Sequence, residues 1–252
     1  MNVENNVFVV TGGARGLGFA IAENLASGRG KLALVDMNKE GLDEAAAALQ
    51  EYNVEVRCYV ANVAVEEEVI ALFDNIQKDF GQIDGLINNA GITRDALLVK
   101  RKNGETTKMS LQAWQQVIDV NLTGVFLCGR EAAAKMVEAG KGGVIVNISS
   151  VCRDGNIGQS NYSAAKAGVS ALTATWGKEL SRFGVRVGAV APGFVNTEMV
   201  KTIPEPVLEK LKELIPLRRL AEPDEIAHTV RYVIENEYFT TRTIAIGGGM
   251  QV

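Results

Sequence analysis

Short, continuously apolar segments alternate with longer segments of helical periodicity along most of the chain. Seven of the short segments are expected to be strands, at residues 6–11, 31–36, 54–60, 83–88, 144–149, 185–190 and 243–246. Because their apolar residues are consecutive, each strand should be covered on both faces. Helical patterns separate them, at residues 16–26, 39–52, 65–80, 111–139, 162–183 and 222–234. This alternation predicts parallel crossovers, with helices on both faces of one sheet.

A length of 252 residues suits one domain of this kind, and no Pro/Gly/Ser-rich linker or short repeat divides the chain. We therefore predict an α/β fold, a single domain over residues 1–252. It should be a Rossmann-type doubly wound sheet of seven mainly parallel strands in the order 3-2-1-4-5-6-7. Residues 93–110 and 196–216 interrupt the rhythm, and we expect them to form loops that cover a substrate.

The composition excludes several classes of function. With 26 basic and 30 acidic residues, the formal net charge is −4, which argues against a nucleic-acid partner. The single histidine, His228, excludes a His-rich zinc site, and we expect no metal. Three widely spaced cysteines indicate free thiols in a reducing compartment. No apolar run reaches the roughly 20 residues that span a bilayer, so we expect a cytoplasmic protein without a membrane partner.

A glycine-rich segment, residues 11–18 (TGGARGLG), joins the first strand to the first helix. Glycines let the backbone approach a pyrophosphate closely, and the helix N-terminus supplies unpaired N–H groups and a favourable dipole. The spacing is Gly-x-x-x-Gly-x-Gly and differs from the most familiar dinucleotide pattern. The expected cofactor contacts in this segment are Gly12, Arg15, Gly16, Leu17 and Gly18.

Asp36 ends the second strand, 18 residues after the last of these glycines. A carboxylate in this place holds the adenosine ribose hydroxyls and repels a 2′-phosphate, which favours NAD(H). Arg15 could instead attract that phosphate. We favour NAD(H) over NADP(H), since the carboxylate both attracts one cofactor and repels the other.

Tyr162 and Lys166 begin the helix that follows the fifth strand. Residues four apart share one helix face, so the two side chains can converge on one site. A phenol with a pKa near 10 is a poor acid–base catalyst at neutral pH, but a nearby ammonium stabilises its phenolate. The pair is therefore a candidate for proton transfer.

Taken together, these motifs resemble the short-chain dehydrogenase/reductase family over nearly the whole chain. The resemblance rests on residues 11–18, Asn62-Val63, residues 88–91 (NNAG), Asn121, Ser149, residues 162–166 (YSAAK) and Pro192-Gly193. Within the family the chain is most similar to 3-oxoacyl-(acyl-carrier-protein) reductases, in residues 88–95 (NNAGITRD), 159–168 (QSNYSAAKAG), 191–194 (APGF) and 247–250 (GGGM).

The resemblance implies four catalytic residues. Tyr162 would give the proton to the carbonyl oxygen or remove it, and Ser149 would orient that oxygen, so both would touch the substrate. Ser150 competes for the second role, but the family spacing to the tyrosine selects Ser149. Lys166 would bind the nicotinamide ribose and lower the pKa of Tyr162, and Asn121 would hold a water in a proton relay.

The resemblance also implies further cofactor contacts. They are Asn62, Val63, Asn89, Ala90, Gly91, Pro192, Gly193, Val195 and Thr197, together with Tyr162 and Lys166. The cofactor would carry the hydride, and the protein would supply orientation and the proton.

The implied function is hydride transfer between NAD(P)H and a ketone or secondary alcohol, most simply reduction of a 3-oxoacyl thioester of acyl carrier protein or CoA. The alternatives are the same chemistry on another ketone or alcohol, and a non-catalytic dinucleotide-binding regulator. Lys100, Arg101 and Lys102 could dock an acidic carrier protein, although a solvated loop is the favoured explanation of this cluster. Helices at 111–139 and 162–183 are apolar on more than one face, and in the family they form a subunit interface, so we expect a homotetramer.

Overall fold

The structure, a computed structural model, describes residues 1–197 and 205–250. Its main sheet has seven strands, all parallel: β1 (Val7–Thr11), β2 (Lys31–Asp36), β3 (Val56–Val60), β4 (Gly85–Asn88), β7 (Gly143–Ile148), β8 (Val185–Pro192) and β9 (Thr243–Ile246). Their spatial order is β3-β2-β1-β4-β7-β8-β9. Because β5 and β6 form a separate hairpin, this is the predicted order 3-2-1-4-5-6-7, and the doubly wound α/β fold is confirmed.

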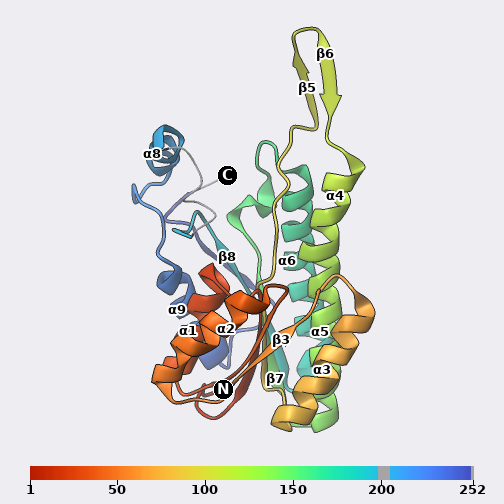
Figure 1. Ribbon diagram of the computed structural model, residues 1–252, viewed down its shortest axis with the longest axis vertical. Helices are drawn as coiled ribbons and strands as arrows, with labels where there is room; N and C mark the ends of the chain where they lie inside the picture. Colours follow the sequence, from red (N-terminus) through yellow and green to blue (C-terminus); the bar gives the residue numbers. More distant parts are fainter. Residues whose placement is uncertain (198–204, 251–252) are drawn as a thin grey trace.

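Helices cover both faces of the sheet (Figure 1). They are α1 (Gly16–Ser27), α2 (Lys39–Ala48), α3 (Glu66–Phe80), α4 (Leu111–Ile118), α5 (Gly124–Ala139), α6 (Ser160–Leu180), α8 (Glu205–Leu214) and α9 (Pro223–Glu235). Helices α1, α2 and α9 bury one core, with Ile21, Leu42 and Val230. Helices α3 and α5 bury the other, with Phe73 and Ala132, and α6 packs against it. None of the described helices is long and apolar enough to cross a membrane.

Strand β1 shows why the apolar runs are continuous. Phe8 and Val10 pack in the core under α1, α2 and α9, whereas Val9 packs in the core under α3 and α5. Successive side chains of a strand point to opposite faces. A sheet covered on both faces therefore needs apolar residues at every position.

A buried polar chain ties the centre of the sheet to α6. Asn88 in β4 donates to the Asn147 side chain in β7 at 2.9 Å, and Asn147 donates to the Thr173 hydroxyl in α6 at 2.9 Å. Thr173 in turn donates to the Val169 carbonyl at 2.9 Å. All three polar side chains are buried. Such groups are stable only while every donor keeps a partner.

Residues 93–110, expected to form a loop, contain a two-stranded antiparallel hairpin, β5 (Val99–Lys102) and β6 (Glu105–Lys108). Its turn residues Asn103 and Gly104 have φ values of 51° and 84°. Asn-Gly with two positive φ angles is typical of the type I′ turn, whose twist matches that of paired strands. The Asn103-Gly104 dipeptide thus indicates a hairpin in the sequence itself, and the expectation that residues 93–110 form only a loop was wrong.

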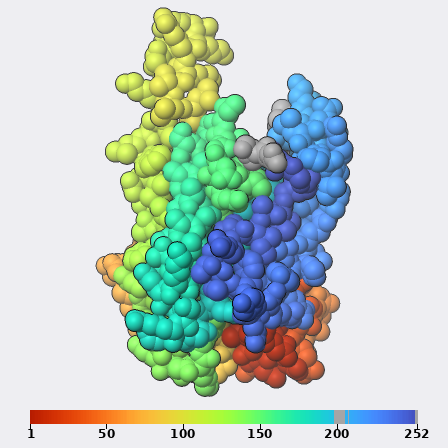
Figure 2. All heavy atoms as spheres, turned by 180° about the vertical axis from the view of Figure 1, so that it is seen from behind, coloured from red at the N-terminus to blue at the C-terminus, as the bar shows by residue number. Residues whose placement is uncertain are grey.

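The second interrupting segment, residues 196–216, contains α8, and its residues 198–204 lie outside the described part of the chain. Helix α8 and the β5–β6 hairpin stand on opposite sides of the molecule beyond the end of the sheet where the strands finish (Figure 1). The space-filling view shows both as projections from the main body (Figure 2). In open α/β sheets this end of the strands is where ligands bind, at the point where strand order reverses. Here that point lies between β1 and β4.

The buried hydrogen bonds that link Asn88, Asn147 and Thr173 lead to a stability prediction. In Thr173→Val the side chain keeps its shape but loses the acceptor for Asn147, which leaves a buried donor unpaired. We expect the free energy of unfolding to fall by about 1–3 kcal/mol, measured by urea denaturation at one fixed protein concentration. Thr175→Val, on the exposed side of the same helix, is the control and should have little effect. Equal effects of the two substitutions would contradict this account of the network.

Candidate active site

The turn between β1 and α1 is fixed to the end of β4. The hydroxyl of Thr11 accepts hydrogen bonds from the backbone N–H groups of Asn89 (3.0 Å) and Ala90 (3.1 Å). The Asn89 side chain donates to the carbonyls of Thr11 (3.0 Å) and Gly12 (3.2 Å). Gly12 has φ +65°, and a Cβ there would lie 2.9 Å from the Asn89 amide nitrogen. Glycine is required here by both conformation and space.

The N-terminus of α1 is open to an anion. Arg15 at the N-cap makes no side-chain capping bond, and the first turn of α1 contains no acidic residue. Gly16 has φ +58°, and a Cβ there would meet only the Thr197 side chain, at 3.9 Å. The free N–H groups and the room above Gly16 suit a pyrophosphate. The turn therefore fits the dinucleotide that the sequence predicts, with Leu17 and Gly18 in the first turn of the helix.

Asp36 lies at the end of β2, beside this turn. One carboxylate oxygen accepts a hydrogen bond from the Ala14 N–H at 3.4 Å and the other from the Asn38 N–H at 3.0 Å. The carboxylate is thus held between the glycine-rich turn and the start of α2. This is the side of the turn on which β2 ends, where the adenosine ribose of a bound dinucleotide is expected.

Asn62 and Val63 follow β3, and Ala90 and Gly91 follow β4. The Asn62 side chain accepts from the Ala64 N–H at 3.0 Å, and Val63 is buried. In the sheet, β3 lies next to β2 and β4 lies next to β1, so these residues follow the ends of the strands that flank the β2–β1 pair. The fold therefore gathers them at the same edge of the sheet as the glycine-rich turn.

Asn121 lies in a π-helical turn, Asp119–Thr123, between α4 and α5. Its side chain accepts from the Ile92 N–H and donates to the Ile92 carbonyl, both at 2.9 Å. The predicted helix at 111–139 is thus continuous but locally widened. Such π-turns occur frequently at functional sites, and here the turn holds the chain that follows β4 in place.

Lys166 is buried in α6, beside Tyr162 on the same helix. Its ammonium nitrogen lies 5.6 Å from the centroid of the Tyr162 ring and donates to the Ile148 carbonyl at 2.7 Å. Burial lowers the pKa of Lys166 from 10.5 to about 8, because the low-dielectric surroundings disfavour the charged form. The predicted convergence of these two side chains is present in the structure.

The two serines after β7 face in opposite directions. The hydroxyl of Ser149 bonds the Lys166 carbonyl (2.9 Å) and the Ser170 hydroxyl (3.0 Å), so it points beneath α6. Ser150 is extended, with φ −162° and ψ 156°, and in extended chain the next side chain points the other way. It is the Ser150 hydroxyl that interacts with the phenol of Tyr162. The Ser149 hydroxyl, which the spacing selected to orient the carbonyl oxygen, is thus engaged beneath α6, whereas the Ser150 hydroxyl lies within reach of the phenol.

The surroundings of the Tyr162 phenol favour its neutral form. Burial raises the pKa of Tyr162 to about 12, and the hydrogen bond with Ser150 opposes that rise. A phenol that gives up its proton at neutral pH needs an additional positive charge nearby. The Lys166 ammonium and a cationic nicotinamide are groups of that kind.

The end of β8 brings the last predicted residues to the site. The N–H of Gly193, after Pro192, donates to the Ile246 carbonyl at 2.8 Å, and Val195 pairs with Ala221. Thr197 follows, and its methyl group lies near the open space above Gly16. The chain from β8 thus faces the glycine-rich turn across the expected pyrophosphate position.

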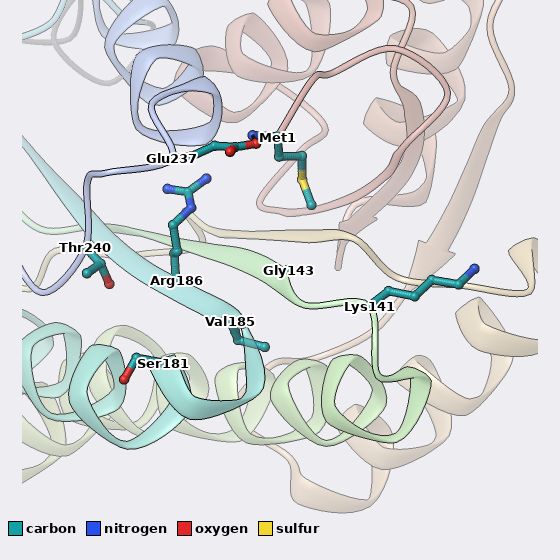
Figure 3. Close-up of a pocket in the computed structure, with 9 residues that line it drawn as sticks. Met1, Lys141, Gly143, Ser181, Val185, Arg186, Glu237 and Thr240 are labelled. Atoms are coloured by element: carbon teal, nitrogen blue, oxygen red, sulfur yellow. Dashed lines mark hydrogen bonds and ion pairs between the residues drawn. The ribbon is translucent and has the colours of Figure 1, made fainter.

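A separate cavity of about 390 Å³ lies away from these residues, at the end of the sheet where the strands begin (Figure 3). Two of the charged side chains that line it are engaged, and the first is Glu237, which accepts from the Met1 amino group at 2.7 Å. Arg186 donates to four backbone carbonyls that end α9 and the following turn. We assign this cavity a structural role.

Among the described residues, no group of three or more His, Cys, Asp or Glu could hold a metal ion.

The sequence profile of the short chain dehydrogenase family matches residues 6–207, and the chain belongs to that family. It is therefore an NAD(P)-dependent oxidoreductase. The chain is 38% identical to a 3-oxoacyl-(acyl-carrier-protein) reductase of Thermotoga maritima over the full length of both proteins. It is 43% identical to the enzyme of that name in Synechocystis, over 97% of this chain and 96% of the relative. The identity to that of Aquifex aeolicus is 39%, over 99% of each.

The buried ammonium predicts a pH dependence of stability. Folding lowers the pKa of Lys166 from 10.5 to about 8, so between these values the unfolded chain binds more protons than the folded one. Lys166 should therefore contribute a rise of the free energy of unfolding with pH in this window, by at most about 1.4 kcal/mol per pH unit in the cofactor-free protein. Burial raises the pKa of Cys128 and of Tyr162 to about 12, and these two groups contribute slopes of the opposite sign, so the Lys166 contribution is measured as a difference between variants.

In Lys166→Met this contribution should disappear, whereas Lys178→Met, at an exposed position of the same helix, should retain it. Urea denaturation at several pH values between 8 and 10.5 measures the difference. Parallel profiles for the wild type and Lys166→Met would show that the ammonium is not held as described.

Proposed function

We propose that this enzyme reduces a 3-oxoacyl thioester, carried by acyl carrier protein or CoA, to the 3-hydroxyacyl form. The supporting observation is the cluster of Ser150, Tyr162 and Lys166 at the same edge of the sheet as the open N-terminus of α1, in a chain similar over its full length to a 3-oxoacyl-(acyl-carrier-protein) reductase. The cluster suits proton transfer to a carbonyl oxygen, and the α1 terminus suits a dinucleotide. A thioester substrate follows from the names of the relatives.

The bound nicotinamide cofactor supplies the hydride that reduces the ketone carbon. Tyr162 then has one task, which is to give its hydroxyl proton to the ketone oxygen as negative charge develops there. The O–H bond of the phenol breaks while an O–H bond forms on the product. The Ser150 hydroxyl, which interacts with the same phenol, donates a hydrogen bond to the ketone oxygen and fixes it for that transfer.

Lys166 stabilises the phenolate that remains. Its ammonium lies 5.6 Å from the Tyr162 ring and is buried, so little solvent screens their attraction. The same ammonium binds the nicotinamide ribose. The Asn121 side chain, which was expected to hold a water for the proton relay, is instead hydrogen-bonded to Ile92. We therefore propose that the backbone of the π-turn binds this water. Such a water returns a proton to Tyr162 through Lys166.

The carbonyl-orienting role goes to Ser150, since the hydroxyl of Ser149 already bonds the Lys166 carbonyl and the Ser170 hydroxyl. Ser149 instead holds β7 against α6. The cofactor contacts are those predicted from the sequence, with Gly12 to Gly18 at the pyrophosphate. The Asp36 carboxylate binds the hydroxyls of the adenosine ribose.

We propose NAD(H) as the preferred cofactor. The carboxylate of Asp36 lies at the turn where a 2′-phosphate would be bound, and it would repel that phosphate. The Arg15 side chain makes no capping bond and offers the opposing attraction. The carboxylate should dominate because it is held by two backbone N–H groups.

We also propose a homotetramer, as in the family. Leu111 in α4 and Phe126 in α5 are exposed in residues 111–139, the first of the two segments expected at the interface. Exposed apolar side chains on neighbouring elements often mark such contacts.

The assignment of roles predicts distinct effects for the two serines. Tyr162→Phe and Ser150→Ala should each lower kcat for reduction of a 3-oxoacyl thioester by roughly 100-fold or more, followed by nicotinamide absorbance. Ser149→Ala is the matched control and should keep kcat within a few-fold of wild type. A loss confined to Ser149→Ala would return the role to that residue, and full activity in Tyr162→Phe would overturn the mechanism.

The cofactor preference is tested by Asp36→Ala. The wild type should have a higher kcat/KM with NADH than with NADPH, and the substitution should move this ratio toward NADPH by roughly tenfold, because it removes one unit of repulsion. Arg15→Ala should move the ratio the opposite way. An unchanged ratio in Asp36→Ala would mean that the carboxylate does not face the ribose.

A further inference from the structure

The β5–β6 hairpin begins immediately beside the residues that precede Tyr162. The Ala96 N–H donates to the Gly158 carbonyl at 2.8 Å, and the Gln159 side chain donates to the Asp95 carboxylate at 3.0 Å. Asn161, next to Tyr162 and fully buried, donates to the Arg94 carbonyl at 3.0 Å. The base of the hairpin, residues 94–96, is thus held at the rim of the candidate active site.

Positive charge is concentrated in this hairpin, although the whole chain has a net charge of −4. Lys100, Arg101, Lys102 and Lys108 are all exposed, and Glu105 is the one carboxylate in the two strands. Within the described ranges, no ion pair involves any of the four cations. The pairing register places Lys100 and Lys102 on one face and Arg101 and Lys108 on the other. Glu105 lies opposite Lys102 on the first face, and the net charge of both faces is positive.

The tip of the hairpin stands too far from the site to meet the reacting end of a small substrate. Lys102 is six residues beyond Ala96, and a strand advances about 3.3 Å per residue, so the tip reaches roughly 20 Å from the base. Nearer the base, Leu97, Leu98 and Val99 are exposed. A ligand along the hairpin thus meets apolar side chains close to the site, with Lys108 opposite Val99, and then the cations of β5 toward the tip. An acyl chain and its linker, attached to an acidic carrier, have that order of properties.

A second copy of this chain is a weaker candidate for the same surface. In a two-fold contact a surface meets itself, so two such hairpins would bring like charges together and repel. An isolated two-stranded hairpin is also only marginally stable in water. Its projection from the body (Figures 1 and 2) therefore indicates an element that functions against a partner of opposite charge.

We propose that the β5–β6 hairpin is the docking arm for an acidic carrier protein that presents the thioester to Tyr162. This inference rests on the proposed function. The arm acts on association with the carrier, because charges at the edge of an interface mainly steer encounter and set its salt dependence. Chemistry at Tyr162 does not involve it.

The test compares three 3-oxoacyl thioesters that share an acyl chain: one on acyl carrier protein, one on CoA, and one on N-acetylcysteamine, which has no charge. In Lys100→Glu/Lys102→Glu, KM for the carrier thioester should rise roughly tenfold with kcat unchanged. KM for the N-acetylcysteamine thioester should stay at the wild-type value. High salt should raise the wild-type KM for the carrier thioester and have less effect on the variant.

Lys78→Glu/Lys178→Glu, at exposed positions of α3 and α6, is the control with the same change in net charge and should leave all three KM values unchanged. Lys100→Gln/Lys102→Gln should give a smaller increase for the carrier thioester. The milder variant keeps the test valid should the charge reversal disturb folding.

An unchanged KM for the carrier thioester in both hairpin variants would overturn the inference. So would an equal rise for the CoA thioester, which would mean that the hairpin binds phosphates of the linker. A change of assembly in light scattering without a change of KM would show that the hairpin joins copies of this chain. If the wild type reduces none of the three thioesters, the proposed function itself fails, which is a different result from the others.

Discussion

The burial of the Lys166 ammonium is the constraint around which the site is arranged. An unpaired charge inside a protein is costly, and here its hydrogen bond is to the Ile148 carbonyl at the end of β7. That bond ties α6 to the end of β7, and with it the position of Tyr162. The lowered pKa of Lys166 reflects the cost. A buried cation so placed is useful because a phenolate can form beside it.

The cofactor end of the site depends on a second set of contacts. Thr11 and Asn89 tie the glycine-rich turn to the end of β4, next to the point where strand order reverses. The N-terminus of α1 is consequently held open, with its N–H groups free. The two halves meet because every strand of the sheet is parallel, which sends all strand ends to one edge.

The sequence predicted the sheet well because apolar runs and helical periodicity are local signals. It predicted less well where a single residue changes direction. Ser149 was preferred over Ser150 by its spacing to Tyr162, but spacing along the chain does not say which way a side chain points. The extended conformation of Ser150 before a 3-10 turn decides that. The Asn103-Gly104 turn was readable from sequence, yet the strands beside it are polar and carry no hydrophobic pattern.

By itself, the sequence determined the order of strands and helices, the glycines that admit a pyrophosphate, and the Tyr162–Lys166 pair on one helix face. Each of these depends on residues within about one helical turn or one strand of each other. Only the tertiary structure decided which serine meets Tyr162, and where the basic hairpin stands relative to the site. Those relations join β7 to α6, and residues 94–96 to residues 158–161. They arise from packing between distant segments, which no local pattern encodes.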